Sequence, residues 1–121
     1  MPQASNKFRS KFEKTVAANL NRLGASFSYE TLKLDYTLLK KYTPDFILDN
    51  GIIIEAKGYW DGADRTKHLA VRKEHPNLDI RFVFQNAYNR INSRSKTTYA
   101  QWCEKYNYLW AHQRIPQEWL L

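Results

Sequence analysis

Apolar residues recur at helical spacing near the start of the chain. The stripe consists of Phe8, Phe12, Val16, Leu20 and Leu23. Spacings of three and four residues place such side chains on one helix face, so the pattern predicts a helix over about residues 5–24. Ser5 or Asn6 suits its N-cap, because a short polar side chain accepts a hydrogen bond from a free N–H of the first turn. Gly24 suits the position after the last helical residue.

The pattern then changes to the period of two that is typical of strands. Residues 27–31 alternate between apolar and polar side chains and predict a first strand. The mostly apolar stretches 45–48 and 52–55 flank Asp49-Asn50-Gly51, which predicts a β-hairpin. Residues 33–43 are expected to be extended, with no register assigned to them.

The second half of the chain alternates between helix and strand patterns. Residues 64–75 are predicted to be helical, with Asp61 or Asp64 as the cap and Pro76 as the stop. The remaining predicted elements are a buried strand over 80–84, a short helix over 97–106 and a last strand over 108–111. The order α-β-β-β-α-β-α-β combines a hairpin with a β-α-β unit. It predicts one α/β domain over residues 1–121, with a mixed β-sheet flanked by helices.

Composition and charge narrow the function classes. The 121 residues carry a formal net charge of +7, and a single cysteine excludes an internal disulfide framework and the usual cysteine-based zinc sites. The chain contains no apolar run long enough for a membrane span and no signal-peptide core, so we expect a cytoplasmic protein without a membrane partner. Basic residues concentrate before Gly24 and over 85–98, whereas acidic residues gather between Asp45 and Asp64. Basic flanks suit phosphates and central carboxylates suit cations, as a metal-dependent nuclease requires; ordinary surface charge is the alternative.

The length of the hairpin loop decides which side chains share a face. A two-residue loop would put Asp45 and Glu55 on opposite faces of the hairpin. A three-residue loop, with Gly51 in the left-handed conformation, would pair them directly. We predict the three-residue loop, which brings Lys57 to the same face because side chains alternate along a strand.

Two carboxylates so close together repel each other unless a cation lies between them. Mg²⁺, for which Mn²⁺ can substitute, prefers oxygen ligands, and the backbone carbonyl of Ala56 is a further candidate ligand. Lys57 would then orient or deprotonate a metal-bound water, or neutralise charge that develops on a phosphodiester. The alternative is an exposed hairpin that carries incidental charged residues.

These residues resemble a known family. Pro44-Asp45 followed by Glu55-Ala56-Lys57, within an α-β-β-β-α-β order, is the pattern of the PD-(D/E)xK, restriction-endonuclease-like nucleases. From Phe8 to Trp119 the chain more specifically resembles the phage endonuclease I family of Holliday-junction resolvases. The stretches that carry this resemblance are Tyr42-Thr-Pro-Asp-Phe46, Asn50-Gly51, Glu55-Ala-Lys-Gly58, Lys67-His-Leu69, His75-Pro76, Leu78-Asp-Ile-Arg81, Val83-Phe84, Trp102-Cys-Glu-Lys105, Ile115-Pro116 and Glu118-Trp119.

The resemblance implies a nuclease that hydrolyses phosphodiesters in branched DNA with two divalent metal ions per site. Asp45 matches the bridging metal ligand, Glu55 the second carboxylate and Lys57 the catalytic lysine. Glu13 matches a helix glutamate that completes the site and joins the metal ligands. From the residues alone, Glu13 lies at the edge of the apolar stripe, and a surface position is the alternative.

The resemblance also implies an intertwined homodimer, in which the helix glutamate serves the other chain's site, and a phage or prophage origin. In this chain the bridge over 34–42 is shorter than is usual in the family, and the basic C-terminal tail is missing. A swapped dimer, a loose dimer and a monomeric nicking enzyme therefore stay open. A mismatch or restriction-like endonuclease of the same fold also stays open, as does a DNA-binding module without cleavage.

Nine residues are candidates for contacts with branched or duplex DNA: Lys7, Arg9, Lys11, Lys67, His68, Arg72, Arg90, Arg94 and Lys96. The resemblance makes Lys67 and His68 phosphate contacts, whereas a solvated helix face is the alternative for Arg72. The acid-free loop over 85–98 suits a segment that follows the DNA backbone without reading sequence, and a disordered connector is the alternative. The four tryptophans and Cys103 are expected in the core, with tryptophan stacking on unpaired bases as the alternative.

Overall fold

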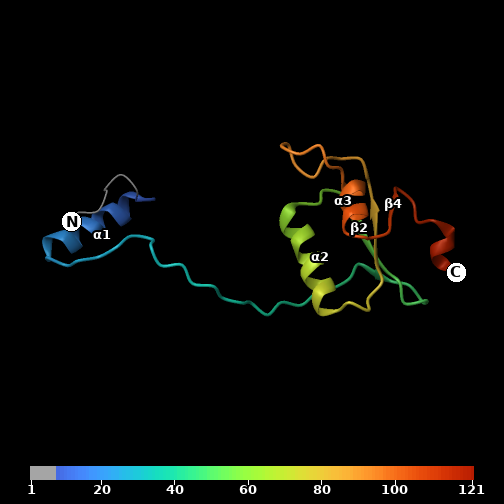
Figure 1. Ribbon diagram of the computed structural model, residues 1–121, viewed down its shortest axis with the longest axis horizontal. Coiled ribbons are helices and arrows are strands. Elements are labelled where there is room, and N and C mark those ends of the chain that lie inside the picture. The colour runs from blue at the N-terminus through green and yellow to red at the C-terminus, as the bar shows by residue number, and fades with distance from the viewer. Residues whose placement is uncertain (1–7) are drawn as a thin grey trace. The chain divides into compact units, whose positions relative to one another are not determined.

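The computed structural model describes residues 8–121, and the chain divides into two units. The first unit ends at Leu39, and the second comprises Lys40–Leu121 (Figure 1). The expectation of one domain over residues 1–121 stays a prediction. Lys7 and the two predicted cap residues of the first helix lie outside the described residues.

The first unit contains helix α1, Lys11–Arg22. Ser10 is its N-cap and accepts a hydrogen bond from the backbone N–H of Glu13 at 3.0 Å, while Glu13 Oε1 accepts the N–H of Arg9 at 2.9 Å. These reciprocal bonds satisfy N–H groups at the helix end, so the helix begins at Lys11. The prediction that it already includes residues 8–10 was wrong. Gly24 follows the helix with φ +72°, as expected for its position.

The strand predicted over 27–31 is absent, since residues 25–45 contain neither helix nor strand. Tyr29 instead donates its hydroxyl hydrogen to Glu13 at 2.6 Å, and its ring meets Phe8 edge to face at 4.5 Å. The side chain of Tyr29 thus packs back against Glu13 of the helix and against Phe8 just before it. That prediction was wrong because alternation alone supplies no partner strand.

The second unit is built on a four-stranded mixed sheet in the order β1-β2-β3-β4. The strands are β1 (Phe46–Ile47), β2 (Ile53–Lys57), β3 (Ile80–Phe84) and β4 (Trp110–His112). β1 runs antiparallel to β2, whereas β2, β3 and β4 are parallel to one another. The connections contain α2 (Gly62–Glu74), α3 (Tyr99–Lys105) and, after the last strand, the 3₁₀ helix η2 (Gln117–Leu120). The predicted α/β class, with its mixed sheet flanked by helices, is confirmed.

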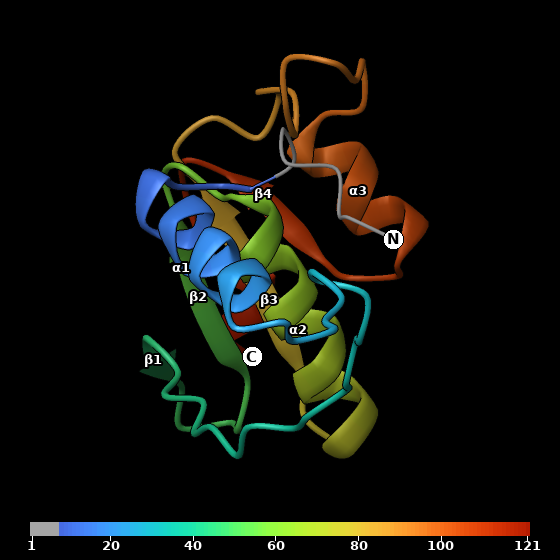
Figure 2. The ribbon, with the colours of Figure 1, turned by 90° about the vertical axis from the view of Figure 1, so that its left-hand side faces the viewer.

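The two faces of this sheet carry separate apolar clusters. On one face, Phe82 and Phe84 of β3 pack with the fully buried Trp60 and with residues of α2 and α3. The ribbons of β3, α2 and α3 can be followed in Figure 2. On the other face, Trp119 of η2 packs against Ile54 and Ala111. The core positions expected for Cys103 and for three of the tryptophans are confirmed, whereas Trp110 is half-buried.

Capping side chains fix where the helices of this unit begin. Asp61 caps α2 by accepting the N–H of Asp64 at 2.8 Å. Thr98 and Gln101 form a capping box at α3. Among the described residues, no helix is long and apolar enough to cross a membrane.

Candidate active site

The hairpin of β1 and β2 has the predicted register. Phe46 pairs with Ile54 and Ile47 with Ile53, and the N–H of Leu48 donates to the Ile52 carbonyl at 2.8 Å. The loop therefore has three residues, and Gly51 takes φ +89°, which only glycine adopts without strain. Continuing the same register by one residue puts Asp45 opposite Glu55.

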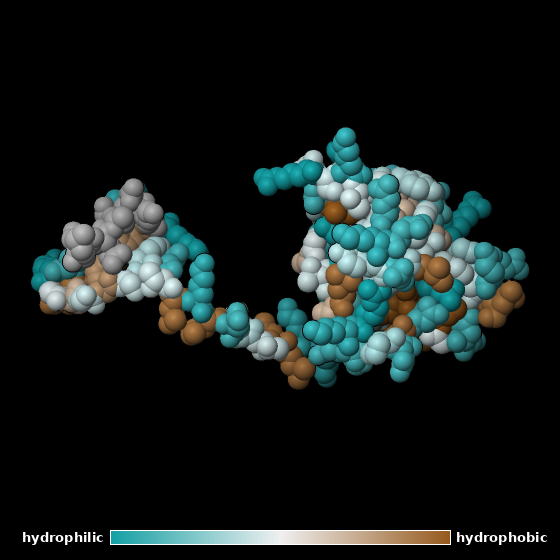
Figure 3. Space-filling view, viewed as in Figure 1, coloured by the Kyte–Doolittle hydropathy of each residue, from teal (hydrophilic) through white to brown (hydrophobic). Residues whose placement is uncertain are grey.

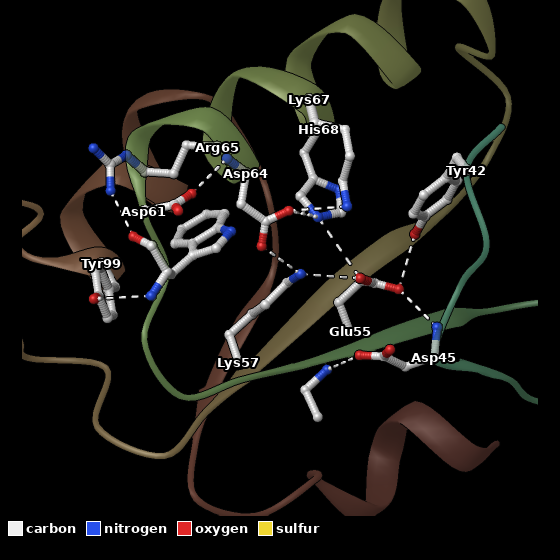
Figure 4. Close-up of polar contacts among 12 residues, drawn as sticks. Tyr42, Asp45, Glu55, Lys57, Asp61, Asp64, Arg65, Lys67, His68 and Tyr99 are labelled. Carbon is white, nitrogen blue, oxygen red and sulfur yellow. Dashed lines mark hydrogen bonds and ion pairs between the residues drawn. The ribbon is translucent and has the colours of Figure 1, made fainter. Parts of the chain in front are cut away.

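The carboxylates of Asp45 and Glu55 each accept a backbone hydrogen bond from across the hairpin (Figure 4). Glu55 Oε2 accepts the backbone N–H of Asp45 at 2.9 Å, and Asp45 Oδ2 accepts the N–H of Ala56 at 2.9 Å. Each carboxylate thus uses one oxygen to hold the opposite strand. Asp45 is exposed, whereas Glu55 is only 2% exposed, so the pair lies between solvent and the core.

Tyr42 is a further partner of Glu55, and the sequence motif that contains it had suggested no role for this side chain. Its hydroxyl donates to Glu55 Oε2 at 3.0 Å. Burial, together with the negative charge and the hydrogen bond of Glu55, raises the pKa of the Tyr42 phenol. Tyr42 therefore keeps its hydroxyl proton and remains a hydrogen-bond donor to Glu55.

Lys57 lies between two carboxylates. Its Nζ is 2.8 Å from Asp64 Oδ2 and 3.2 Å from Glu55 Oε1, and its side chain is 11% exposed. Burial lowers the pKa of Lys57, but the hydrogen bond and charge of Asp64 and the charge of Glu55 outweigh it, so the pKa is raised. The side chain is thus an ammonium group with two fixed acceptors.

Asp64 is, after Tyr42, a second site residue that sequence reasoning missed, because it was considered only as a helix cap. It lies in the first turn of α2, and its other oxygen, Oδ1, is 3.0 Å from Lys67 Nζ. Burial raises its pKa, but the hydrogen bonds from Lys57 and Lys67 prevail and lower it, so Asp64 is a carboxylate. The sequence signal that could have identified Asp64 is its position seven residues after Lys57, in the first turn after the helix cap Asp61.

His68 lies beneath this group and is closed off from solvent. Its side chain is 0% exposed, and Nε2 is 3.6 Å from Glu55 Oε1 and 3.7 Å from Asp64 Oδ1. The ring meets Tyr42 and Phe82 edge to face. Burial, aided by the charge of Lys57, lowers the pKa of His68 to about 4, so the imidazole is neutral. The predicted phosphate contact was wrong, because an enclosed ring cannot reach a DNA backbone.

The other predicted DNA contacts of this unit fall into two groups. Lys67 is half exposed and pairs with Asp64, while Arg90, Arg94 and Lys96 are exposed in the loop before α3. Arg72 instead donates to the Tyr106 carbonyl and covers the Tyr108 ring at 4.4 Å. The Arg72 guanidinium is therefore engaged in packing within the fold.

Glu13 belongs to the first unit. Its Oε1 accepts from the Tyr29 hydroxyl and from the Arg9 N–H, and these bonds, that of Tyr29 foremost, lower its pKa. Arg9 pairs with Glu30 at 3.0 Å, and Lys11 is in the first turn of α1. The completion of the site by Glu13, and DNA contacts by Arg9 and Lys11, stay predictions.

The oxygen atoms at the hairpin fit a hard divalent cation. Within residues 8–121, no three His, Cys, Asp or Glu side chains converge into a metal-binding group. Mg²⁺ does not require such a cage, since it is usually held by one or two carboxylates together with water and substrate phosphates. Asp45 and Glu55 supply that number of carboxylates. The hydrogen bonds across the hairpin use Asp45 Oδ2 and Glu55 Oε2, which leaves Asp45 Oδ1 and leaves Glu55 Oε1 facing Lys57 Nζ at 3.2 Å.

Comparison with known proteins places the chain in a family. The family profile described as phage endonuclease I matches residues 2–121. The chain is 46% identical over 112 residues to Endodeoxyribonuclease 1 of Enterobacteria phage T3. The aligned region covers 90% of this chain and 74% of that protein. It is 43% identical over 116 residues to Endonuclease I of Escherichia phage T7. Here the aligned region covers 93% of this chain and 78% of that protein. The resemblance drawn from the motifs is thereby confirmed, and the chain belongs to the phage endonuclease I family.

Proposed function

We propose that this protein is a metal-dependent endodeoxyribonuclease that hydrolyses phosphodiesters in branched DNA, such as four-way (Holliday) junctions. Family membership supports the endonuclease class. The observation that carries the chemistry is the Asp45–Glu55 pair at the hairpin, with the ammonium of Lys57 3.2 Å from Glu55. An anionic pair beside a fixed cation suits a reaction in which a metal ion and a phosphate must be held together.

Asp45 and Glu55 would hold Mg²⁺, or Mn²⁺ in its place, with the Ala56 carbonyl as a further ligand. A bound ion of this kind lowers the pKa of water and polarises a phosphate oxygen. We propose two ions per site, with Glu13 completing the second ligand set. The carboxylate character of Glu13, whose pKa is lowered, supports that role.

Lys57 would act through its positive charge. Asp64 and Glu55 accept from its Nζ and leave it little freedom, so the ammonium is pre-oriented beside the carboxylate pair. A donor fixed in advance stabilises charge that develops on a phosphate without the cost of reorganisation. Of the roles open to Lys57 from the sequence, its paired geometry favours orientation and charge stabilisation over removal of a proton from water.

The DNA would be held mainly through its phosphates. The net charge of +7 and the exposed Arg90, Arg94 and Lys96 support a backbone-directed, sequence-independent grip. Branched DNA offers phosphates of several helical arms to such a surface. Action in the cytoplasm of a bacterial host fits the phage sources of the two relatives.

We further propose a homodimer, in which two sites make paired cuts. The extended segment 31–39 supports it, because Leu32, Leu34, Tyr36 and Leu38 alternate with polar residues and have no strand partner among the described residues. Figure 3 shows apolar surface along this segment. A second copy of the chain would cover such a surface. A monomer that only nicks DNA is the competing outcome.

The test compares a labelled immobile four-way junction with a linear duplex of the same arm sequence, each with Mg²⁺ and with EDTA. We expect Mg²⁺-dependent cleavage of the junction well above that of the duplex, and loss of cleavage in Lys57→Ala. Equal cleavage of both substrates would contradict the selectivity for branches. Binding without cleavage would instead support a non-catalytic DNA-binding module, and the molar mass in solution separates the dimer from the monomer.

A further inference from the structure

Arg65 of α2 is a buried arginine that has no part in the site described above. It is 8% exposed, and its Nη1 donates to the Trp60 carbonyl at 2.6 Å and to the Ile91 carbonyl at 3.3 Å. Figure 4 shows the first of these bonds. A guanidinium group is costly to bury unless its donors find acceptors. Here one nitrogen joins two loops that are 31 residues apart in the chain.

The first loop is the turn that follows β2, the strand that carries Glu55 and Lys57. Trp60 lies three residues after Lys57, and its indole is fully buried between Phe82, Phe84 and Trp102. Its backbone is held on both sides, since the N–H donates to the Tyr99 hydroxyl at 3.1 Å while the carbonyl accepts from Arg65. This turn is therefore a fixed reference point next to Lys57.

The second loop is the basic loop, defined here as residues 89–98. It is closed by a bridge between Arg90 and Thr98, by the Ile91 N–H donating to the Thr97 carbonyl at 2.8 Å, and by the Tyr99 N–H donating to the Asn89 carbonyl at 2.9 Å. Its cationic side chains are exposed. The basic loop is thus an ordered, hairpin-like projection and not a disordered connector.

Both loops leave the same edge of the sheet. β3 ends at Phe84, which pairs with Lys57 at the end of β2, and the chain reaches the basic loop five residues later. The Gln85 N–H donates to the Lys57 carbonyl at 2.9 Å, so the two strand ends are also joined directly. Arg65 adds the connection farther out, between the turn after Lys57 and the base of the basic loop.

We propose that Arg65 is a positioning residue that fixes the basic loop relative to Lys57. The loop's cations then contact DNA phosphates at a set distance from the phosphodiester to be cleaved. A loop held in place before binding loses less conformational freedom when DNA arrives, so the affinity for DNA is higher. This inference rests on the proposed nuclease function and adds to it a second DNA-contacting element and the residue that holds it.

The test compares Arg65→Met with Arg81→Met in the full-length protein. Arg81 is a matched control, because its guanidinium is also packed, against the Trp119 ring and the Asp79 carboxylate, but contacts neither loop. Single-turnover cleavage of the four-way junction gives the apparent Kd and the rate at saturation. Hydrogen exchange at the Ile91 amide reports directly on closure of the basic loop. Arg65→Lys is the second variant, and it decides the matter if Arg65→Met does not fold.

For Arg65→Met we expect the apparent Kd to rise about tenfold, the rate at saturation to stay within about threefold, and Ile91 exchange to accelerate at least tenfold. For Arg81→Met we expect no change in the apparent Kd or in Ile91 exchange, even if its thermal stability falls as much as that of Arg65→Met. Equal effects in both variants, unchanged exchange in Arg65→Met, or a loss of rate with unchanged Kd would each overturn the proposal. Failure of the wild-type protein to cut the junction would contradict the nuclease function, whereas the exchange measurement would still judge the connection made by Arg65.

Discussion

Lys57 Nζ lies 2.8 Å from Asp64 Oδ2, in a pair that joins the end of β2 to the first turn of α2. The same nitrogen is 3.2 Å from Glu55, so Asp64 holds the ammonium from one side while the carboxylate pair of the hairpin holds it from the other. A charge of this kind acts best when its direction is set before the substrate binds. Asp64 is therefore central to the site although it need not touch DNA.

Asp64→Asn should impair catalysis more than binding. The amide keeps the shape of the side chain but loses the charge that orients Lys57, and a misplaced catalytic group costs about 100-fold in rate. We expect kcat on the four-way junction to fall by roughly 10- to 100-fold, with KM changed less than about threefold. The matched control is Asp49→Asn in the hairpin loop, which should retain the wild-type kcat; equal losses in both variants would contradict the role of Asp64.

Tyr42→Phe should loosen Glu55. The lost hydrogen bond, from the phenol to a buried carboxylate at 3.0 Å, is of the charged class, worth about 1.5–3 kcal/mol. We expect the free energy of unfolding in urea to fall by about 1–3 kcal/mol and cleavage to slow several-fold. Tyr59→Phe, at an exposed position beside the same strand, serves as the control and should alter neither quantity. An unchanged stability of Tyr42→Phe would contradict the bond.

His68 should make the fold sensitive to mild acid. Burial lowers its pKa from 6.5 to about 4, so between these values the unfolded chain binds a proton that the folded chain does not. Above pH 6.5, His68 is neutral in both states and does not reduce the free energy of unfolding. As the pH falls from 6.5 toward 4, protonation of His68 in the unfolded chain lowers that free energy. Within this window the equilibrium constant for unfolding should rise by up to about tenfold for each pH unit by which the pH is lowered.

Comparison with His68→Phe isolates this effect. Among the described residues, neither ring nitrogen of His68 has a hydrogen-bond partner, and its neighbours include aromatic rings, so a phenyl group suits the site. Urea unfolding at a series of pH values from 7 to 4 should give a shallower loss of stability in the variant. Parallel curves for the two proteins would show that His68 is not the titrating group.

Two glycines should respond oppositely to alanine. Gly51 has φ +89°, and no atom of the described residues lies within 4 Å of an added Cβ. The cost of Gly51→Ala is therefore that of the left-handed backbone, about 1–2 kcal/mol. Gly62 begins α2, and among the described residues an added Cβ would meet Arg65 Nη2 at 3.4 Å, which is an ordinary van der Waals contact. Gly62→Ala should therefore leave the free energy of unfolding unchanged or raise it slightly. Equal destabilisation of both variants would contradict the assigned loop conformation.

The hairpin shows what the sequence can determine. Gly51 in a three-residue loop sets the register, and the register puts Asp45 opposite Glu55. Turn chemistry narrowed the loop to two lengths, and the longer one, which pairs the two carboxylates, was the correct prediction. The burial of Trp60 and Cys103 also followed from their apolar character. These features depend on short-range contacts or on hydrophobicity, both of which a single sequence displays.

Other features depend on partners that the sequence does not display. The resemblance predicted that His68, beside Lys67, contacts a phosphate, but across the fold His68 packs against Phe82 of β3 and is fully buried. Asp64 pairs with Lys57 only because α2 packs back onto the sheet. The alternation at 27–31 suggested a strand, yet Tyr29 instead bonds to Glu13. Tertiary contacts override local pattern in each case.

The dependence of junction cleavage on Mn²⁺ tests the central claim most directly. Single-turnover rates would be measured over rising Mn²⁺ concentration for the wild type, for Asp45→Asn and for the hairpin control Asp49→Asn. We predict that the wild type and Asp49→Asn follow one saturable curve, while Asp45→Asn stays at least about 100-fold slower at every concentration. Cleavage by Asp45→Asn along the wild-type curve would contradict a metal site at the Asp45–Glu55 pair.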